Sequence, residues 1–128
     1  MNKVNEYVIK LSKFIPEFLE YWEADEGGFN FGDESTIYGV FSDFSTLVIE
    51  RLENKTLNNN EQLFLFIESV ILLGGDEANA ACTCFLENIL NQIPGTVAPS
   101  DFVQYLGPQS REFCRGWDDF TGVKTDGV

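Results

Sequence analysis

IYGVFSDFSTLVIERLEN, residues 37–54, is the stretch that decides the fold. Its apolar residues recur at three- and four-residue spacing, which places them on one side of a helix. They are Ile37, Val40, Phe41, Phe44, Leu47, Val48 and Leu52. A polar run, residues 54–60, follows this stripe. The pattern therefore predicts a long amphipathic helix that ends near residue 54.

The residues before this helix predict two shorter helices and a loop. The first helix occupies the first fifteen residues and is indicated by four apolar residues at helical spacing: Val4, Val8, Leu11 and Ile15. Pro16 suits the first position of a second helix. The apolar side of that helix would be Phe18, Leu19 and Trp22. Three glycines within residues 25–32 indicate a loop, after which Asp33 or Ser35 can cap the long helix.

Helical spacing continues after residue 60. A stripe from Leu63 to Ile71 ends at Gly74-Gly75, and Asp76 opens a further helix that contains Ile89 and ends at Pro94-Gly95. A short helix is expected between Pro99 and Tyr105. Gly107-Pro108 then begins a last helix, for which Ser110 is a candidate cap and three aromatic residues are expected to close the core: Phe113, Trp117 and Phe120. With no alternating strand and no fixed repeat, residues 1–128 are expected to form a single all-α domain, a compact bundle of about six to seven helices.

The composition limits the partners. The chain has 128 residues, of which 44% are hydrophobic. This length and composition are sufficient for a single domain with its own hydrophobic core. Its 21 acidic and 8 basic residues give a net charge of −13, which repels nucleic acid and anionic membranes and attracts basic proteins. No stretch is long and apolar enough to cross a bilayer, and polar residues interrupt the N-terminus where a signal peptide would be apolar. A cytoplasmic location is therefore expected.

The acidic charge is concentrated in EFLEYWEADEGGFNFGDES, residues 17–35. This segment has seven carboxylates and five aromatic rings but no Lys or Arg. Acids from Asp101 onward, by contrast, share their segment with three bases: Arg111, Arg115 and Lys124. Carboxylates can steer a basic partner, and aromatic residues can anchor it. The predicted partner-binding residues are Glu17, Glu20, Tyr21, Glu23, Asp25, Glu26, Phe29, Phe31, Asp33 and Glu34.

The sequence offers no recognisable catalytic, cofactor or metal motif. The chain contains no His, which excludes Ser/His and Cys/His nucleophile pairs. Its glycine pairs lack the Lys and Ser/Thr of a phosphate loop, and its acidic runs lack the order of a calcium loop. Cys82-Thr83-Cys84 has the wrong spacing for zinc or redox pairs, so the cysteines, Cys114 included, are expected in a helical core. No catalytic residue, cofactor or metal is predicted.

Two segments carry a resemblance to known proteins. Residues 81–90, ACTCFLENIL, and residues 105–123, YLGPQSREFCRGWDDFTGV, look like a family of small, acidic, all-helical bacterial proteins without catalytic annotation. In size, acidity and lack of catalytic motifs, the whole chain resembles the immunity proteins that protect bacteria from their own contact-dependent growth-inhibition toxins. This resemblance implies that the chain is not an enzyme and binds a cognate toxin domain. We expect that domain to be a basic nuclease whose substrate cleft is occluded.

Two alternatives remain open from the sequence. The first is an enzyme or small-molecule binder with a pocket between helices, in which Asp118 and Asp119 would act. The second is an acidic adaptor or nucleic-acid mimic that binds several unrelated basic proteins. A single cognate partner would distinguish the immunity protein from this second alternative.

Overall fold

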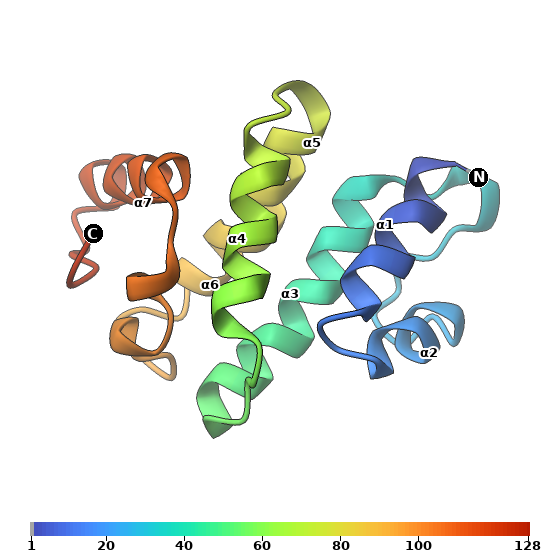
Figure 1. The fold of residues 1–128 in the computed structure, drawn as a ribbon, viewed down its shortest axis with the longest axis horizontal. Helices are drawn as coiled ribbons and strands as arrows, with labels where there is room; N and C mark the ends of the chain where they lie inside the picture. The colour runs from blue at the N-terminus through green and yellow to red at the C-terminus, as the bar shows by residue number, and fades with distance from the viewer. Residues whose placement is uncertain (1) are drawn as a thin grey trace.

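The computed structural model describes residues 2–128, and every regular element among these residues is helical (Figure 1). The long helix predicted from the sequence is α3 (Ile37–Asn54). It lies near the middle of the molecule, and its stripe faces the core: Val40, Phe41, Phe44 and Val48 are fully buried. The prediction of an all-α fold is confirmed.

The N-terminal part consists of α1 (Lys3–Ser12), α2 (Glu17–Glu23) and the 3₁₀ turn η1 (Gly32–Glu34). Helix α1 contacts both α2 and α3. Helix α3 is capped by Thr36, whose hydroxyl accepts from the backbone N–H of Gly39. The expectation that Asp33 or Ser35 would be the cap is therefore wrong, because these residues belong to or follow the η1 turn.

The middle of the chain forms α4 (Asn60–Ile71) and a second helical rod behind it (Figure 1). This rod consists of α5 (Gly75–Asn79), a π-helical segment η2 (Ala80–Leu86) and α6 (Glu87–Leu90). A π-helix has one more residue per hydrogen-bonded turn than an α-helix, and its widened turns are usually found singly within α-helices. The helix predicted from Asp76 to Pro94-Gly95 is thus present, but it has a wider middle section and ends earlier, at Leu90, followed by turns.

The C-terminal part comprises the 3₁₀ turns η3 (Pro99–Asp101) and η4 (Val103–Tyr105), followed by α7 (Pro108–Thr121). The N-terminus of α7 is held by Glu68 of α4. Its carboxylate accepts from the backbone N–H groups of Gln109 and Ser110, each at 2.9 Å, and from the Ser110 hydroxyl at 2.8 Å. Ser110 is therefore not the cap that its position suggested; its hydroxyl donates to the side chain that acts as the cap.

Five fully buried phenylalanines connect the two ends of the core. Successive rings lie 5.2, 5.9, 6.0 and 5.8 Å apart, in the order Phe18, Phe44, Phe85, Phe64 and Phe102. Each aromatic pair contributes roughly 0.5–1.5 kcal/mol beyond its burial. The chain of rings runs from α2 through α3, η2 and α4 to the start of η4, so it ties together segments that are distant in sequence.

Part of the C-terminal prediction is wrong. Phe113 and Trp117 are half-buried and pack on the core, but Phe120 is 84% exposed. Phe120 is close to the end of α7, where Trp117 is its aromatic neighbour, and it does not close the core. Among residues 2–128 no helix is long and apolar enough to cross a membrane.

Candidate functional site

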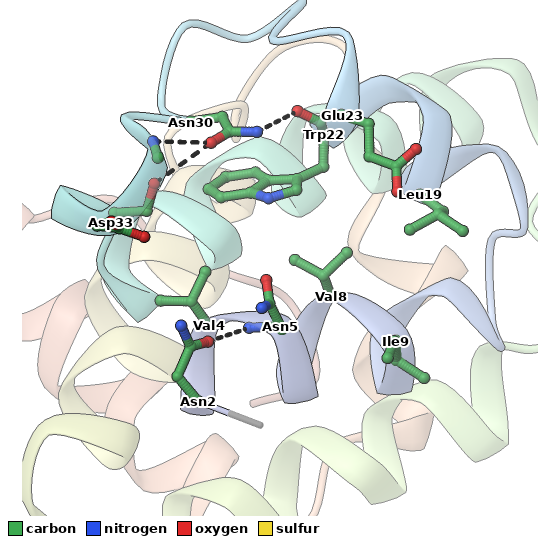
Figure 2. A pocket seen from close by; sticks show the side chains of 12 residues that line it. Asn2, Val4, Asn5, Val8, Ile9, Leu19, Trp22, Glu23, Asn30 and Asp33 are labelled. Carbon is green, nitrogen blue, oxygen red and sulfur yellow. Dashed lines mark hydrogen bonds between the residues drawn. The ribbon is translucent and has the colours of Figure 1, made fainter.

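Helix α2 separates two depressions in the surface. The first, here called the α1–α2 groove, has a volume of about 470 Å³. Its lining comes from α1, α2 and the η1 region: Asn2, Val4, Asn5, Val8, Ile9, Leu19, Trp22, Glu23, Asn30, Gly32, Asp33 and Ser35 (Figure 2). The second, here called the α2–α3 hollow, has a volume of about 360 Å³ and is lined by Glu17, Glu20, Tyr21, Glu26, Leu47, Glu50 and Arg51.

The α1–α2 groove has an apolar floor. Val8 and Trp22 are buried beneath it, with 3% and 4% of their surfaces exposed. Leu19 of α2 and Ile9 of α1 lie at its mouth and keep 41% and 44% of their surfaces exposed (Figure 2). Two large aliphatic side chains therefore remain accessible above a buried apolar floor.

Some of the polar side chains of the groove bond to the protein itself. Asn30 donates from Nδ2 to the backbone carbonyl of Trp22 at 3.0 Å, and its Oδ1 accepts from the backbone N–H of Gly32 at 3.1 Å (Figure 2). Asn2 accepts from the backbone N–H of Asn5 at 2.8 Å and caps α1. These bonds fix part of the polar wall, whereas the exposed side chain of Asn5 makes no hydrogen bond within residues 2–128 and remains available in the groove.

Two of the predicted acids, Glu23 and Asp33, line the groove, and both are exposed. No Lys or Arg lines it in the part of the chain that the structure describes. Within residues 2–128, no basic side chain lies within ion-pairing distance of either carboxylate. The groove therefore combines a buried apolar floor and two exposed aliphatic side chains with polar and anionic groups.

Four other predicted residues line the α2–α3 hollow: Glu17, Glu20, Tyr21 and Glu26. Glu17 forms an ion pair with Arg51 of α3 at 2.9 Å, so part of the acidic charge is neutralised there. Tyr21 is half-buried, and its pKa is raised by desolvation and by nearby carboxylates, of which Asp43 is the first. The hollow is more polar than the groove and contains a cation of its own.

The remaining predicted residues belong to neither depression. Asp25 has a positive φ of 54° and accepts from the backbone N–H of Asn30 at 3.0 Å, so it shapes the loop. Phe29 contacts Gly39 of α3, where an added Cβ would lie 3.0 Å from the Cβ of Phe29. Phe31 is 62% exposed, and Glu34 is also exposed. The predicted residues therefore form one continuous segment of sequence but occupy several different surfaces.

Sequence reasoning missed the aliphatic part of the groove. Ile9 lies outside the stripe of Val4, Val8 and Leu11 that turns α1 toward the core. An apolar residue outside such a stripe was the available signal. Leu19 was predicted on the buried side of α2 beside Phe18, but it turns toward α1 and solvent.

Sequence reasoning also gave no site role to Asp43, which is 1% exposed on α3. Its Oδ2 atom has no hydrogen-bond partner among the described residues, and Gly27 packs so closely that an added Cβ would lie 1.9 Å from Oδ1. Desolvation, reinforced by the charge of Asp25, raises the pKa of Asp43 to about 6. Asp43 therefore lies directly beneath the acidic loop as an unpartnered carboxyl group.

The cysteines and the C-terminal acids have structural surroundings. Burial raises the pKa of Cys82 to about 11 and that of Cys114 to about 12, so both thiols stay protonated near neutral pH. Asp118 accepts from the backbone N–H of Thr125 at 2.7 Å and from its hydroxyl at 2.8 Å. Among residues 2–128, no group of three or more His, Cys, Asp or Glu side chains is arranged to hold a metal ion.

Comparison with known proteins gives a family but no activity. No curated protein and no solved structure matches the chain. One family profile matches residues 8–122, which include every helix from α2 to α7 and the second half of α1. Because this match spans most of the sequence, the chain belongs to the family described as Domain of unknown function (DUF7674).

Proposed function

We propose that this protein is a cytoplasmic immunity protein that binds a cognate toxin domain and neutralises it. The observation that carries the proposal is the set of exposed carboxylates on α2 and η1 that have no basic partner within residues 2–128: Glu20, Glu23, Asp33 and Glu34. Carboxylates that the fold does not use are free to bind groups on another molecule.

The partner in this proposal is a basic nuclease domain. Lys and Arg side chains that hold nucleic acid can instead form charge-assisted hydrogen bonds with carboxylates. A net charge of −13 speeds the approach of such a partner and repels its nucleic-acid substrate. The immunity protein acts by occupying the substrate cleft, and it has no catalytic step of its own.

The test uses the toxin domain encoded by the neighbouring upstream gene. We expect tight one-to-one binding that abolishes the toxic activity. Replacing Glu20, Glu23 and Glu26 together with Lys should slow association at least tenfold at low salt and flatten its dependence on salt. Stopped-flow kinetics at two or more salt concentrations measure both effects. Asp25 is kept because its carboxylate holds the loop.

A matched control reverses three exposed acids elsewhere: Glu53, Glu61 and Asp119. None of them takes part in an ion pair within residues 2–128. Both variants change the net charge equally, so a specific docking surface requires the α2 variant to lose far more affinity. Equal loss of affinity in the two variants would show that overall charge, and not a specific surface, causes the effect. Absence of any complex with the toxin domain would contradict the proposal.

A further inference from the structure

We infer, building on the proposed function, that the α1–α2 groove receives an aliphatic side chain of the partner that is flanked by Lys or Arg. The occupant is a segment of a basic protein with an apolar residue at its centre. The groove volume of about 470 Å³ lies within the usual range for binding pockets, about 300–1,000 Å³. The inference assigns the contact to one side of α2 and gives the chemistry of the contacting segment.

The aliphatic part of this assignment comes from Ile9 and Leu19. These side chains project from two different helices toward one groove and remain more than two-fifths exposed, at 44% and 41%. An apolar group placed between Ile9 and Leu19 would remove surface of both side chains from water. It would rest on the buried side chains of Val8 and Trp22, which form the floor of the groove. Asn30 and Asn2 already bond to the backbone, so of the three Asn side chains in the described lining only that of Asn5 is free for a polar group of the ligand.

The cationic part comes from the rim. Glu23 on α2 and Asp33 in η1 line the same groove, and the described lining contains no Lys or Arg. A cation beside the aliphatic anchor can reach these carboxylates while it remains partly hydrated. Such rim contacts mainly increase the association rate and the selectivity, whereas the buried anchor mainly slows dissociation.

The α2–α3 hollow fits this partner less well. Arg51 lines it and pairs with Glu17, so an incoming cation there would meet a resident positive charge. The exposed aliphatic pair of the groove has no counterpart in the hollow, where Leu47 is 9% exposed. The groove and the hollow thus differ in both charge and apolar surface, and this difference makes the inference testable.

Trp22 provides the signal for the test. The chain has two Trp residues, so the Trp117→Phe variant leaves Trp22 as the only source of Trp fluorescence. Three helical peptides serve as probes: one of leucine and lysine with the leucines on one face, one with glutamate in place of lysine, and one with alanine in place of leucine. We expect a saturable change in Trp22 emission with the leucine–lysine peptide and at least tenfold weaker binding of the other two.

The decisive variant is Leu19→Asp. It adds a negative charge to the groove while removing an aliphatic side chain, so attraction by charge alone would strengthen peptide binding. The inference instead predicts at least a tenfold loss of affinity for the leucine–lysine peptide. The control is Leu65→Asp, which adds the same charge on α4 at a 67% exposed leucine that does not line the groove. Circular dichroism confirms that both variants are folded.

The outcomes separate the inference from the proposed function. Loss of binding in Leu19→Asp but not in Leu65→Asp supports the groove. Equal binding of the alanine–lysine peptide, together with no loss in Leu19→Asp, overturns the aliphatic anchor and leaves an acidic docking surface in place. If neither lysine peptide binds, although the wild-type chain neutralises the toxin domain, the groove assignment is wrong while the immunity function stands.

Discussion

The two ends of the molecule use their charged side chains differently. At the end formed by α7 and residues 122–128, charged side chains hold the chain together. At the end formed by α1, α2 and η1, many charged side chains face solvent. Arg111 donates to the backbone carbonyls of Val103 and Gly127, and Arg115 donates to that of Val128. Glu20, Glu23 and Glu26 on the opposite side have no comparable ion-pair partner within residues 2–128.

The same difference holds for the two buried carboxylates. Glu68, at 7% exposure, accepts three hydrogen bonds and fixes the start of α7. Asp43, at 1% exposure, has an Oδ2 atom without a partner among the described residues. A buried carboxylate stabilises a fold when donors surround it and destabilises it when they are absent. The two acids are equivalent in composition, but their surroundings give them opposite effects on the stability of the fold.

The largest effect is expected for Glu68→Ala. It leaves the backbone N–H groups of Gln109 and Ser110 and the Ser110 hydroxyl without their acceptor, so the free energy of unfolding should fall by about 3 kcal/mol. Urea denaturation measures it. Gln62→Ala, at an exposed position of the same helix, should change stability by less than about 0.5 kcal/mol. Similar losses in both variants would show that Glu68 does not act as the cap.

An opposite and smaller effect is expected for Asp43→Asn. An acid whose pKa is higher in the folded than in the unfolded chain binds its proton more tightly when folded, so wild-type stability should rise as pH falls from about 6 toward 4. Above that window the variant should be more stable than wild type by about 1–2 kcal/mol, because no charge is buried. Urea denaturation at several pH values measures this. An unchanged pH profile in Asp43→Asn would show that another group causes it.

The smallest effect on stability is expected for the variant with Glu20, Glu23 and Glu26 replaced by Lys. These exposed acids have no ion-pair partner within residues 2–128, so the free energy of unfolding should change by less than about 1 kcal/mol. Thermal unfolding at low and high salt measures the change. A loss of several kcal/mol would mean that the fold depends on these carboxylates and would remove the contrast between the two ends.

The sequence predicted what local periodicity determines. The stripe of α3 identified its buried face correctly, because residues three and four apart share one side of any helix. Asp43 was also within reach of this reasoning, since it lies on the side of α3 shared by Val40 and Leu47, both buried. The helical pattern therefore places Asp43 on the buried side of α3, although a count of acidic residues does not separate it from the solvated acids.

Features that depend on contacts between distant segments were not predictable in this way. Glu68 and Ser110 are separated by 42 positions, and nothing local to either residue shows that they meet. The groove likewise requires α1 and η1 to approach α2 from two sides, so its aliphatic pair was missed although Glu23 and Asp33 were identified. The acidic residues of the candidate site were thus predicted, whereas the groove that they line was not.

Helices α1 and α2, which line the groove, and the C-terminal residues lie toward opposite ends of the long axis of the molecule (Figure 1). Asn2 lines the groove, whereas the backbone carbonyl of Val128 accepts from Arg115 at the other end. An affinity tag or fluorescent protein fused ahead of Asn2 would emerge beside the groove and compete with any ligand there. Fusion or surface immobilisation through the far end leaves the groove accessible, so the orientation of the fusion decides whether a screen for partners can succeed.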